Sequence, residues 1–222
     1  MRAVRTAVAV MASVTLLTVQ PTPARADTFA GNFFPSHWGP YPHISVPPSS
    51  PFYRAVVLID NTGDAALNAH IQLFSQIINN LHNGYNSNYP VILYYKDIVF
   101  VPGQPCALGA PGWLIACKDE TLGGTGSPTA PGSAAIFPSG APANHIFYAT
   151  ARFRPSIADP LCAGDKFTLV VQLISNTLGL DQNLTNPASA LYPTIPVGRC
   201  TYNGWTGAEL DRMNLMYNHS VG

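Results

Sequence analysis

The sequence has few charged residues and no excess of either sign. Only 10% of the 222 residues are charged, with 11 basic and 11 acidic side chains. A surplus of basic residues is what binds nucleic acid or an anionic membrane surface electrostatically. Because that surplus is missing, we expect neither of them as a partner.

Long hydrophobic runs are missing after the first 26 residues. No later stretch approaches the roughly 18 apolar residues of a membrane-spanning helix, so we expect no helical anchor in the mature chain. Residues 1–26 are typical of an export signal. Arg2 and Arg5 precede a short apolar run from Ala7 to Val19, and Ala24-Arg25-Ala26 has the form of a cleavage site. We therefore predict a secreted protein; retention of the segment as an anchor is the alternative.

Removal of residues 1–26 makes the chain slightly acidic. Three arginines and no acidic residue are lost, which leaves 8 basic against 11 acidic side chains, or a net charge of −3. The remaining chain has the size of one domain. Residues 27–51, rich in Pro, Gly, Ser and aromatics without a period, predict an extended arm whose aromatics pack on a domain formed by residues 52–222.

Closely spaced cysteine pairs are also absent. The four cysteines lack the Cys-x-x-Cys spacing of a structural zinc site, which argues against a metal-binding role for them. An even number of cysteines in an exported chain favours two disulfides, and four cysteines allow three pairings. We favour Cys106–Cys117, which closes a short loop, and Cys162–Cys200, which ties the region before one helix to the loop after it.

Hydrophobic periodicity predicts strands and helices in alternation. The sequence favours strands at residues 54–60, 90–100, 113–117 and 145–153, helices at 64–82, 166–178 and 206–217, and mostly loop at 122–142. The run at 54–60 is continuously apolar, which indicates a strand that is buried on both faces. The strand, helix and strand over residues 54–100 predict a crossover between two parallel strands.

The helix predicted at 166–178 is apolar except for one stripe. At about 100° per residue, Gln172, Ser175 and Asn176 collect on one side of it. Gln172 and Asn176 are four residues apart and point the same way. Gly179 is placed to end the helix in a left-handed cap, and Gln182 follows just beyond that turn.

This stretch, Gln172-Leu-Ile-Ser-Asn-Thr-Leu-Gly-Leu-Asp-Gln182, resembles the His-Glu-x-x-His-x-x-Gly-x-x-His zinc motif of the metzincin endopeptidases, most closely its matrixin-like form. The resemblance places the three zinc-ligand positions on Gln172, Asn176 and Gln182, and the general base on Leu173. Neutral amides are poor zinc ligands. A general base is commonly worth about 10² to 10⁴ in rate, and Leu cannot accept a proton. We therefore expect no zinc, no other cofactor and no catalytic residue.

Two later segments resemble the same family. Ser189-Ala-Leu-Tyr-Pro193 resembles the Ser-x-Met-Tyr-Pro turn beneath the metzincin zinc site, with Leu191 in place of the methionine and Tyr192 after it. Residues 206–217 resemble the closing helix. The resemblance implies an α+β fold with an α/β-like N-terminal part, as a single metzincin-like domain with a twisted mixed sheet, two long helices, a C-terminal helix and long loops.

Other chemistry has weaker support. None of the six histidines forms a His-x-x-x-His pair or lies beside an acidic cluster, so we expect surface or packing roles for them. Ser175 lacks the Gly-x-Ser-x-Gly turn of a serine nucleophile. We expect Asp181 to accept hydrogen bonds from backbone amides at the turn.

The resemblance suggests three functions. The first is a monomeric pseudoprotease whose degenerate cleft binds a peptide or protein. In the family the substrate lies extended along an edge strand, which needs no metal, and we predict residues 113–117 as that edge. The second is an active extracellular metalloendopeptidase with a rearranged zinc site, or another hydrolase in the same cleft. The third is a structural or envelope-associated protein that only inherits the fold.

Overall fold

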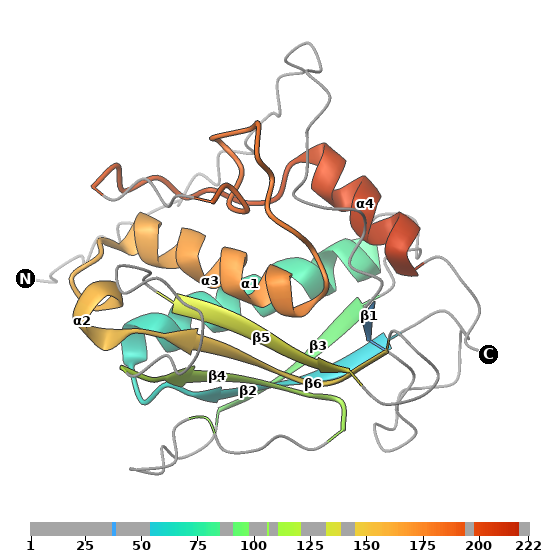
Figure 1. Ribbon diagram of the computed structural model, residues 1–222, viewed down its shortest axis with the longest axis horizontal. Helices are drawn as coiled ribbons and strands as arrows, with labels where there is room; N and C mark the ends of the chain where they lie inside the picture. Colours follow the sequence, from blue (N-terminus) through green and yellow to red (C-terminus); the bar gives the residue numbers. More distant parts are fainter. Residues whose placement is uncertain are drawn as a thin grey trace, which may run out of the picture.

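Six strands and four helices make up the described part of the chain (Figure 1). The computed structural model describes residues 37–38, 54–84, 91–97, 106, 111–120, 132–138, 145–193 and 198–217. The strands are β1 (His37–Trp38), β2 (Arg54–Asn61), β3 (Val91–Asp97), β4 (Trp113–Lys118), β5 (Gly132–Pro138) and β6 (His145–Phe153). The helices are α1 (Ala65–Gly84), α2 (Pro155–Ala158), α3 (Ala163–Thr177) and α4 (Gly207–Tyr217).

The strands form one mixed sheet in the order β1-β6-β4-β2-β3, with β5 also paired to β6. All of these pairings are parallel except that of β5, which runs antiparallel to β6. β2 and β3 are parallel neighbours joined through α1, so the predicted crossover is confirmed. The mixed sheet and the helices confirm an α+β fold.

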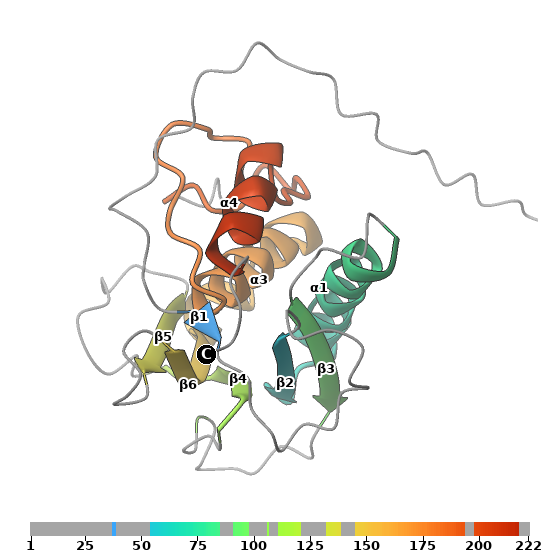
Figure 2. The ribbon, with the colours of Figure 1, turned by 90° about the vertical axis from the view of Figure 1, so that its right-hand side faces the viewer.

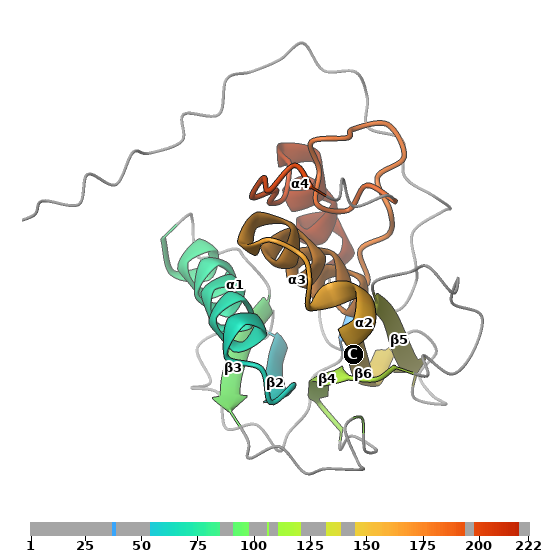
Figure 3. The same cartoon turned by 90° about the vertical axis from the view of Figure 1, so that its left-hand side faces the viewer.

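Both long helices cover the same face of the sheet (Figure 2). Alternate residues of β2 show the two faces: Val56 and Leu58 belong to the main core beneath the helices, whereas Val57 and Ile59 belong to a smaller cluster on the opposite face. All four are buried, which confirms the prediction that this strand is buried on both sides. α4 lies over α3, on the side away from the sheet (Figure 3).

One prediction about strands is wrong, and one strand was not predicted. β4, predicted as the edge of the sheet, lies between β2 and β6, because a strand on each side pairs with it in parallel. Residues 122–142, predicted as mostly loop, contain β5. The small residues of β5 have little strand propensity of their own, and pairing along β6 supplies the structure.

The predicted arm is described only at His37–Trp38, which forms β1; the rest of residues 27–51 and all of the export signal at 1–26 lie outside the described residues. Trp38 is fully buried in the main core, and its indole Nε1 donates a hydrogen bond of 2.9 Å to the carbonyl oxygen of Thr177. The prediction that the aromatics of the arm pack is therefore confirmed for Trp38.

Both predicted disulfides are present. Cys106 is bonded to Cys117 and Cys162 to Cys200, with Cα atoms 5.5 and 5.6 Å apart. The first lies on the face of the sheet away from the helices, where Cys117 belongs to the smaller apolar cluster. Among the described residues, no helix combines the length and the apolar character needed to cross a membrane.

Candidate functional site

The polar stripe of α3 is largely covered by protein. Ser175 is fully buried, Gln172 is 7% exposed, and Asn176 is half-buried. The hydroxyl of Ser175 donates to the carbonyl oxygen of Val171 and accepts a 2.6 Å hydrogen bond from the indole of Trp205. The polar stripe that the sequence predicts on this helix is therefore buried at Ser175 and Gln172, and Trp205, distant in sequence, packs over Ser175.

The C-terminal end of α3 makes the bend that the sequence predicts at Gly179. Gly179 has a φ of 95°, in the left-handed region that favours glycine. Its N–H donates to the carbonyl oxygen of Asn176, and the N–H of Leu180 donates to that of Ser175, each over 3.1 Å. These two bonds define a Schellman motif, which satisfies helix-end carbonyls and sends the chain away from the helix axis.

Gln172, where the resemblance has the first zinc ligand, is hydrogen-bonded to the turn at residues 189–193. Its Nε2 donates a 2.9 Å hydrogen bond to the carbonyl oxygen of Tyr192. Leu191, where the resemblance has a methionine, is fully buried in the core. The structure thus brings together the first residue of the motif and the turn that sequence resemblance placed beneath it, although 20 residues separate them.

The two other residues that the resemblance aligns with zinc ligands lie around the bend. Asn176 follows Gln172 by one turn of α3, and Gln182 comes three residues after Gly179; both side chains are half-buried. Asp181 accepts a 2.7 Å hydrogen bond from the backbone N–H of Gln182, in agreement with the predicted role at the turn. Gln172 donates to the backbone of the turn rather than to either of the other two amides.

Leu173, where the resemblance has the general base, is a core residue. It is 4% exposed and packs against the start of β5 at Gly132. A Cβ atom built on Gly132 would lie 2.5 Å from Leu173 Cδ1 and 2.6 Å from the carbonyl oxygen of Arg152. The absence of a side chain at Gly132 therefore allows β5 to approach the motif helix this closely.

A buried carboxylate, which sequence reasoning missed, organises the segment after the bend. Glu209 of α4 is fully buried and accepts hydrogen bonds from the Ser189 hydroxyl and from Asn183 Nδ2, the latter over 3.1 Å. Asn183 and Leu191 also join through a backbone bond of 3.0 Å. Both ends of the segment that follows the motif are thus tied to one side chain of the last helix.

The same carboxylate caps α4. Its Oε2 accepts a 2.7 Å bond from the N–H of Thr206, while the Thr206 hydroxyl accepts one of 3.4 Å from the N–H of Glu209. This reciprocal pair is a capping box, and Thr206-x-x-Glu209 is its readable signature in the sequence. Burial raises the pKa of Glu209, although hydrogen bonds from Ser189, Thr206 and Asn183 partly offset that effect.

One group of metal-type side chains lies close together in the described part of the chain. Ligand atoms of Cys162, Asp165 and Cys200 are all within 4.8 Å of one another. The two cysteines are bonded to each other. The Asp165 carboxylate accepts backbone bonds from Gly198 and Cys200, of 2.7 and 3.0 Å. Because thiolates are absent, this group fixes the N-terminal end of α3 rather than forming a metal site.

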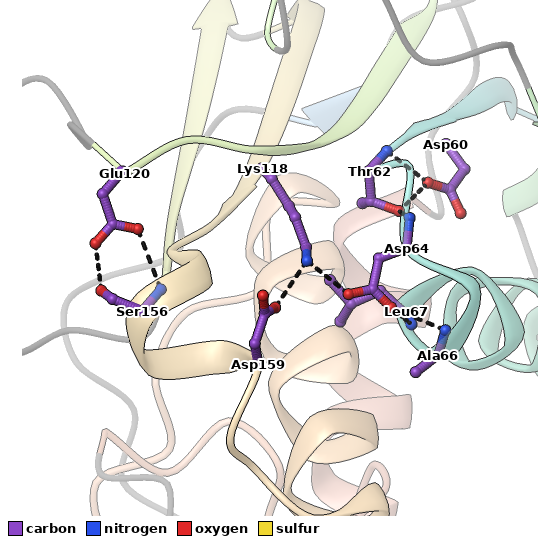
Figure 4. Close-up of polar contacts among 9 residues, drawn as sticks. All are labelled: Asp60, Thr62, Asp64, Ala66, Leu67, Lys118, Glu120, Ser156 and Asp159. Atoms are coloured by element: carbon purple, nitrogen blue, oxygen red, sulfur yellow. Dashed lines mark hydrogen bonds and ion pairs between the residues drawn. The ribbon is translucent and has the colours of Figure 1, made fainter. Parts of the chain in front are cut away.

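A second polar cluster lies at the carboxyl ends of β2 and β4 (Figure 4). The ammonium group of Lys118 contacts carboxylate oxygens of Asp64 at 2.6 Å and Asp159 at 2.7 Å. Asp64 also caps α1, accepting from the N–H groups of Ala66 and Leu67. Burial alone would raise the pKa of Asp64, but these bonds and the ion pair lower it. The cluster joins three segments of the chain through one ammonium group that lies between two carboxylates.

Comparisons with known proteins give no match. No model of a protein family matches the chain, and no curated protein is found as a relative of it.

Proposed function

We propose that this chain is an exported, non-catalytic protein of metzincin-like fold that binds an extended segment of peptide or protein. The observation that carries the proposal is the hydrogen bond from Gln172 to the carbonyl of Tyr192. It joins the degenerate motif to the turn that the resemblance places beneath a zinc site. The Schellman bend at Gly179, between the two, gives the motif its change of direction.

The side chains at the reactive positions support binding without catalysis. Gln172, Asn176 and Gln182 offer neutral amides where zinc takes imidazole, thiolate or carboxylate. Leu173 is sealed into the core against Gly132, so no water is activated from that position. Peptide binding by strand addition requires only backbone hydrogen bonds and side-chain pockets, and the loss of zinc leaves it intact.

Strand β5 is the surface that suits such a segment. It pairs with β6 on one side and, in the described part of the chain, with no strand on the other. Its first residue, Gly132, contacts the motif helix at Leu173. A peptide added to β5 would therefore pass beside the degenerate site. The two disulfides accord with an oxidising, extracellular compartment.

Metal content and proteolysis test the proposal directly. The protein without residues 1–26 would be purified, analysed for metals, and incubated with a denatured protein with and without a chelator. We expect no stoichiometric zinc and no cleavage. Stoichiometric zinc with chelator-sensitive cleavage would instead establish the active-protease alternative.

Restoring the ligands tests the fold relationship separately. The variant Gln172→His/Asn176→His/Gln182→His should bind Zn²⁺, or Co²⁺ as a spectroscopic probe, with tetrahedral character. The control is Gln72→His/Gln76→His, which places two histidines four residues apart on the exposed side of α1. The triple variant should bind on the order of tenfold more tightly than this two-ligand control, because a third imidazole completes a zinc site. If both variants fold, equal affinities would contradict the metzincin-like geometry.

A further inference from the structure

The segment at residues 198–206, here called the strap, is fastened along α3. The Cys162–Cys200 disulfide and the Asp165 carboxylate hold its beginning. The indole of Trp205 holds its end through Ser175. In between, the Thr168 hydroxyl donates to the carbonyl oxygen of Thr201 and accepts from the N–H of Asn203, over 3.0 and 3.1 Å.

Tyr202 lies between Thr201 and Asn203, and its ring packs against α1 and α3. The ring centroids of Tyr202 and Phe167 are 5.6 Å apart, and those of Tyr202 and His70 are 6.4 Å apart. His70 in turn meets Phe167 edge to face at 6.0 Å. Tyr202 is 60% exposed whereas Phe167 is 6% exposed. Because the backbone on both sides is bonded to Thr168, a displacement of the Tyr202 ring requires rotation of its own side chain.

The charges around His70 disfavour its protonated form. α3 presents Lys166 to it, and the strap presents the uncharged phenol of Tyr202. The carboxylate of Asp165, also on α3, accepts from two backbone N–H groups of the strap. Burial, followed by the positive charge of Lys166, lowers the pKa of His70 below its ordinary value of 6.5. The closed cluster of three rings therefore contains a neutral imidazole at neutral pH.

We propose that His70 is a pH-sensitive switch for the Tyr202 ring, which covers Phe167 while the imidazole is neutral and swings into solvent when the imidazole is protonated. An imidazolium next to Lys166 needs hydration, and the Tyr202 ring lies edge to face against the imidazole. The opened cluster would expose the face of Phe167 to solvent at acidic pH.

The direction of the pH dependence follows from proton linkage. With Tyr202 swung out, His70 is hydrated and its pKa rises toward the ordinary value; with Tyr202 in place it is lower. The open form therefore binds the proton more tightly, so acidification favours opening. The preference for the closed form is complete above the pKa that His70 has in the open form. This preference is lost as the pH falls to the pKa that His70 has in the closed form.

Aromatic NMR of the mature chain, with ¹³C-labelled His, Tyr and Phe, tests the proposal between pH 8 and 5. We expect His70 to titrate below pH 6.5, with the rings of Tyr202 and Phe167 shifting at the same midpoint. In His70→Phe, which keeps an aromatic ring and removes the proton site, the Tyr202 signals should stay constant over this range. Lys166→Gln should move the midpoint upward, and it serves as a second variant if His70→Phe fails to fold.

Three results would overturn the switch. His70 could titrate while the Tyr202 ring stays fixed, which would leave the imidazole as a packing residue only. The Tyr202 shift could persist in His70→Phe, which would assign it to another group. The midpoint could remain unchanged in Lys166→Gln, which would remove the electrostatic cause.

Discussion

Gln172 of the motif helix donates its side-chain amide to the carbonyl oxygen of Tyr192, so that a single bond of 2.9 Å joins α3 to the turn at residues 189–193. Zinc-ligand positions in an active metzincin would aim at the ion. Where the resemblance has the first zinc ligand, this chain has Gln172 bonded to the protein backbone, and Leu191 of the same turn is fully buried in the core.

This bond predicts different results for two substitutions of Gln172. Gln172→Ala should lower the free energy of unfolding by about 1 kcal/mol, the net value of one such bond. Gln172→Glu keeps the size of the side chain, but its ionised carboxylate would face the Tyr192 carbonyl without a proton to donate. We expect Gln172→Glu to be the less stable variant at pH 7 and to recover at acidic pH, as measured by urea denaturation. Equal stability of Glu and Gln at pH 7 would contradict the donor role.

Glu209 should be the most sensitive polar residue of the C-terminal part. Glu209→Ala leaves the donors of Asn183, Ser189 and Thr206 without their buried partner, and we expect a loss of about 3 kcal/mol or more. Hydrogen exchange at residues 183–193 should accelerate in this variant. Unchanged exchange there would show that the segment is held by other contacts.

Glu209 also predicts a pH dependence. Its pKa in the folded state is raised by burial above the ordinary value of 4.5, so the folded chain binds this proton more tightly than the unfolded chain. The corresponding stability is complete below pH 4.5 and is lost as the pH rises through the raised pKa. Glu209→Gln, which cannot ionise, should flatten this part of the stability profile. A profile identical to that of the parent would contradict the shift.

Gly179 should resist substitution. Gly179→Ala places a Cβ on a left-handed residue and should cost about 1 to 2 kcal/mol. Gly179→Asn should cost less, because Asn tolerates that conformation better. Gly207→Ala is the matched control: a Cβ there meets no atom within 4 Å and lies in a helix, so we expect unchanged or slightly higher stability. If thermal unfolding gives Gly179→Ala the same stability as the Gly207→Ala control, the prediction is wrong.

Lys118→Met should destabilise the chain modestly, by about 1 kcal/mol, because the ion pairs are partly exposed. The lowered pKa of Asp64 contributes stability that is present above its ordinary value of 3.8 and is lost as the pH falls through the lowered value. The parent should therefore lose more stability than Lys118→Met on acidification through that range. Parallel acid profiles for the two proteins would contradict this role.

Sequence patterns predicted the elements whose signals are local. The apolar run of β2, the periodic helices α1, α3 and α4, and the left-handed bend at Gly179 follow from residue types and spacing. The position of β4 inside the sheet does not, because strand order depends on pairing between distant segments. β5 was missed for a similar reason: its residues form a strand against β6 and Leu173 and carry little signal of their own.

The candidate site was predicted in part. The spacing of the motif indicated Gly179, and the resemblance indicated Leu191 and Tyr192 as neighbours of the motif. The burial of Ser175 depends on Trp205, which lies 30 residues later. The hydrogen bonds of Glu209 to Asn183 and Ser189 likewise depend on residues outside its helix. Only its capping box with Thr206 can be read from the sequence.

The Cys162–Cys200 bond turns the stretch from the start of α3 to the strap into a closed covalent ring that includes the whole motif and its turn. A protease that cuts this stretch once would open the ring without dividing the molecule. Nicked chains would migrate as a single species on a denaturing gel until a reductant separates the two pieces.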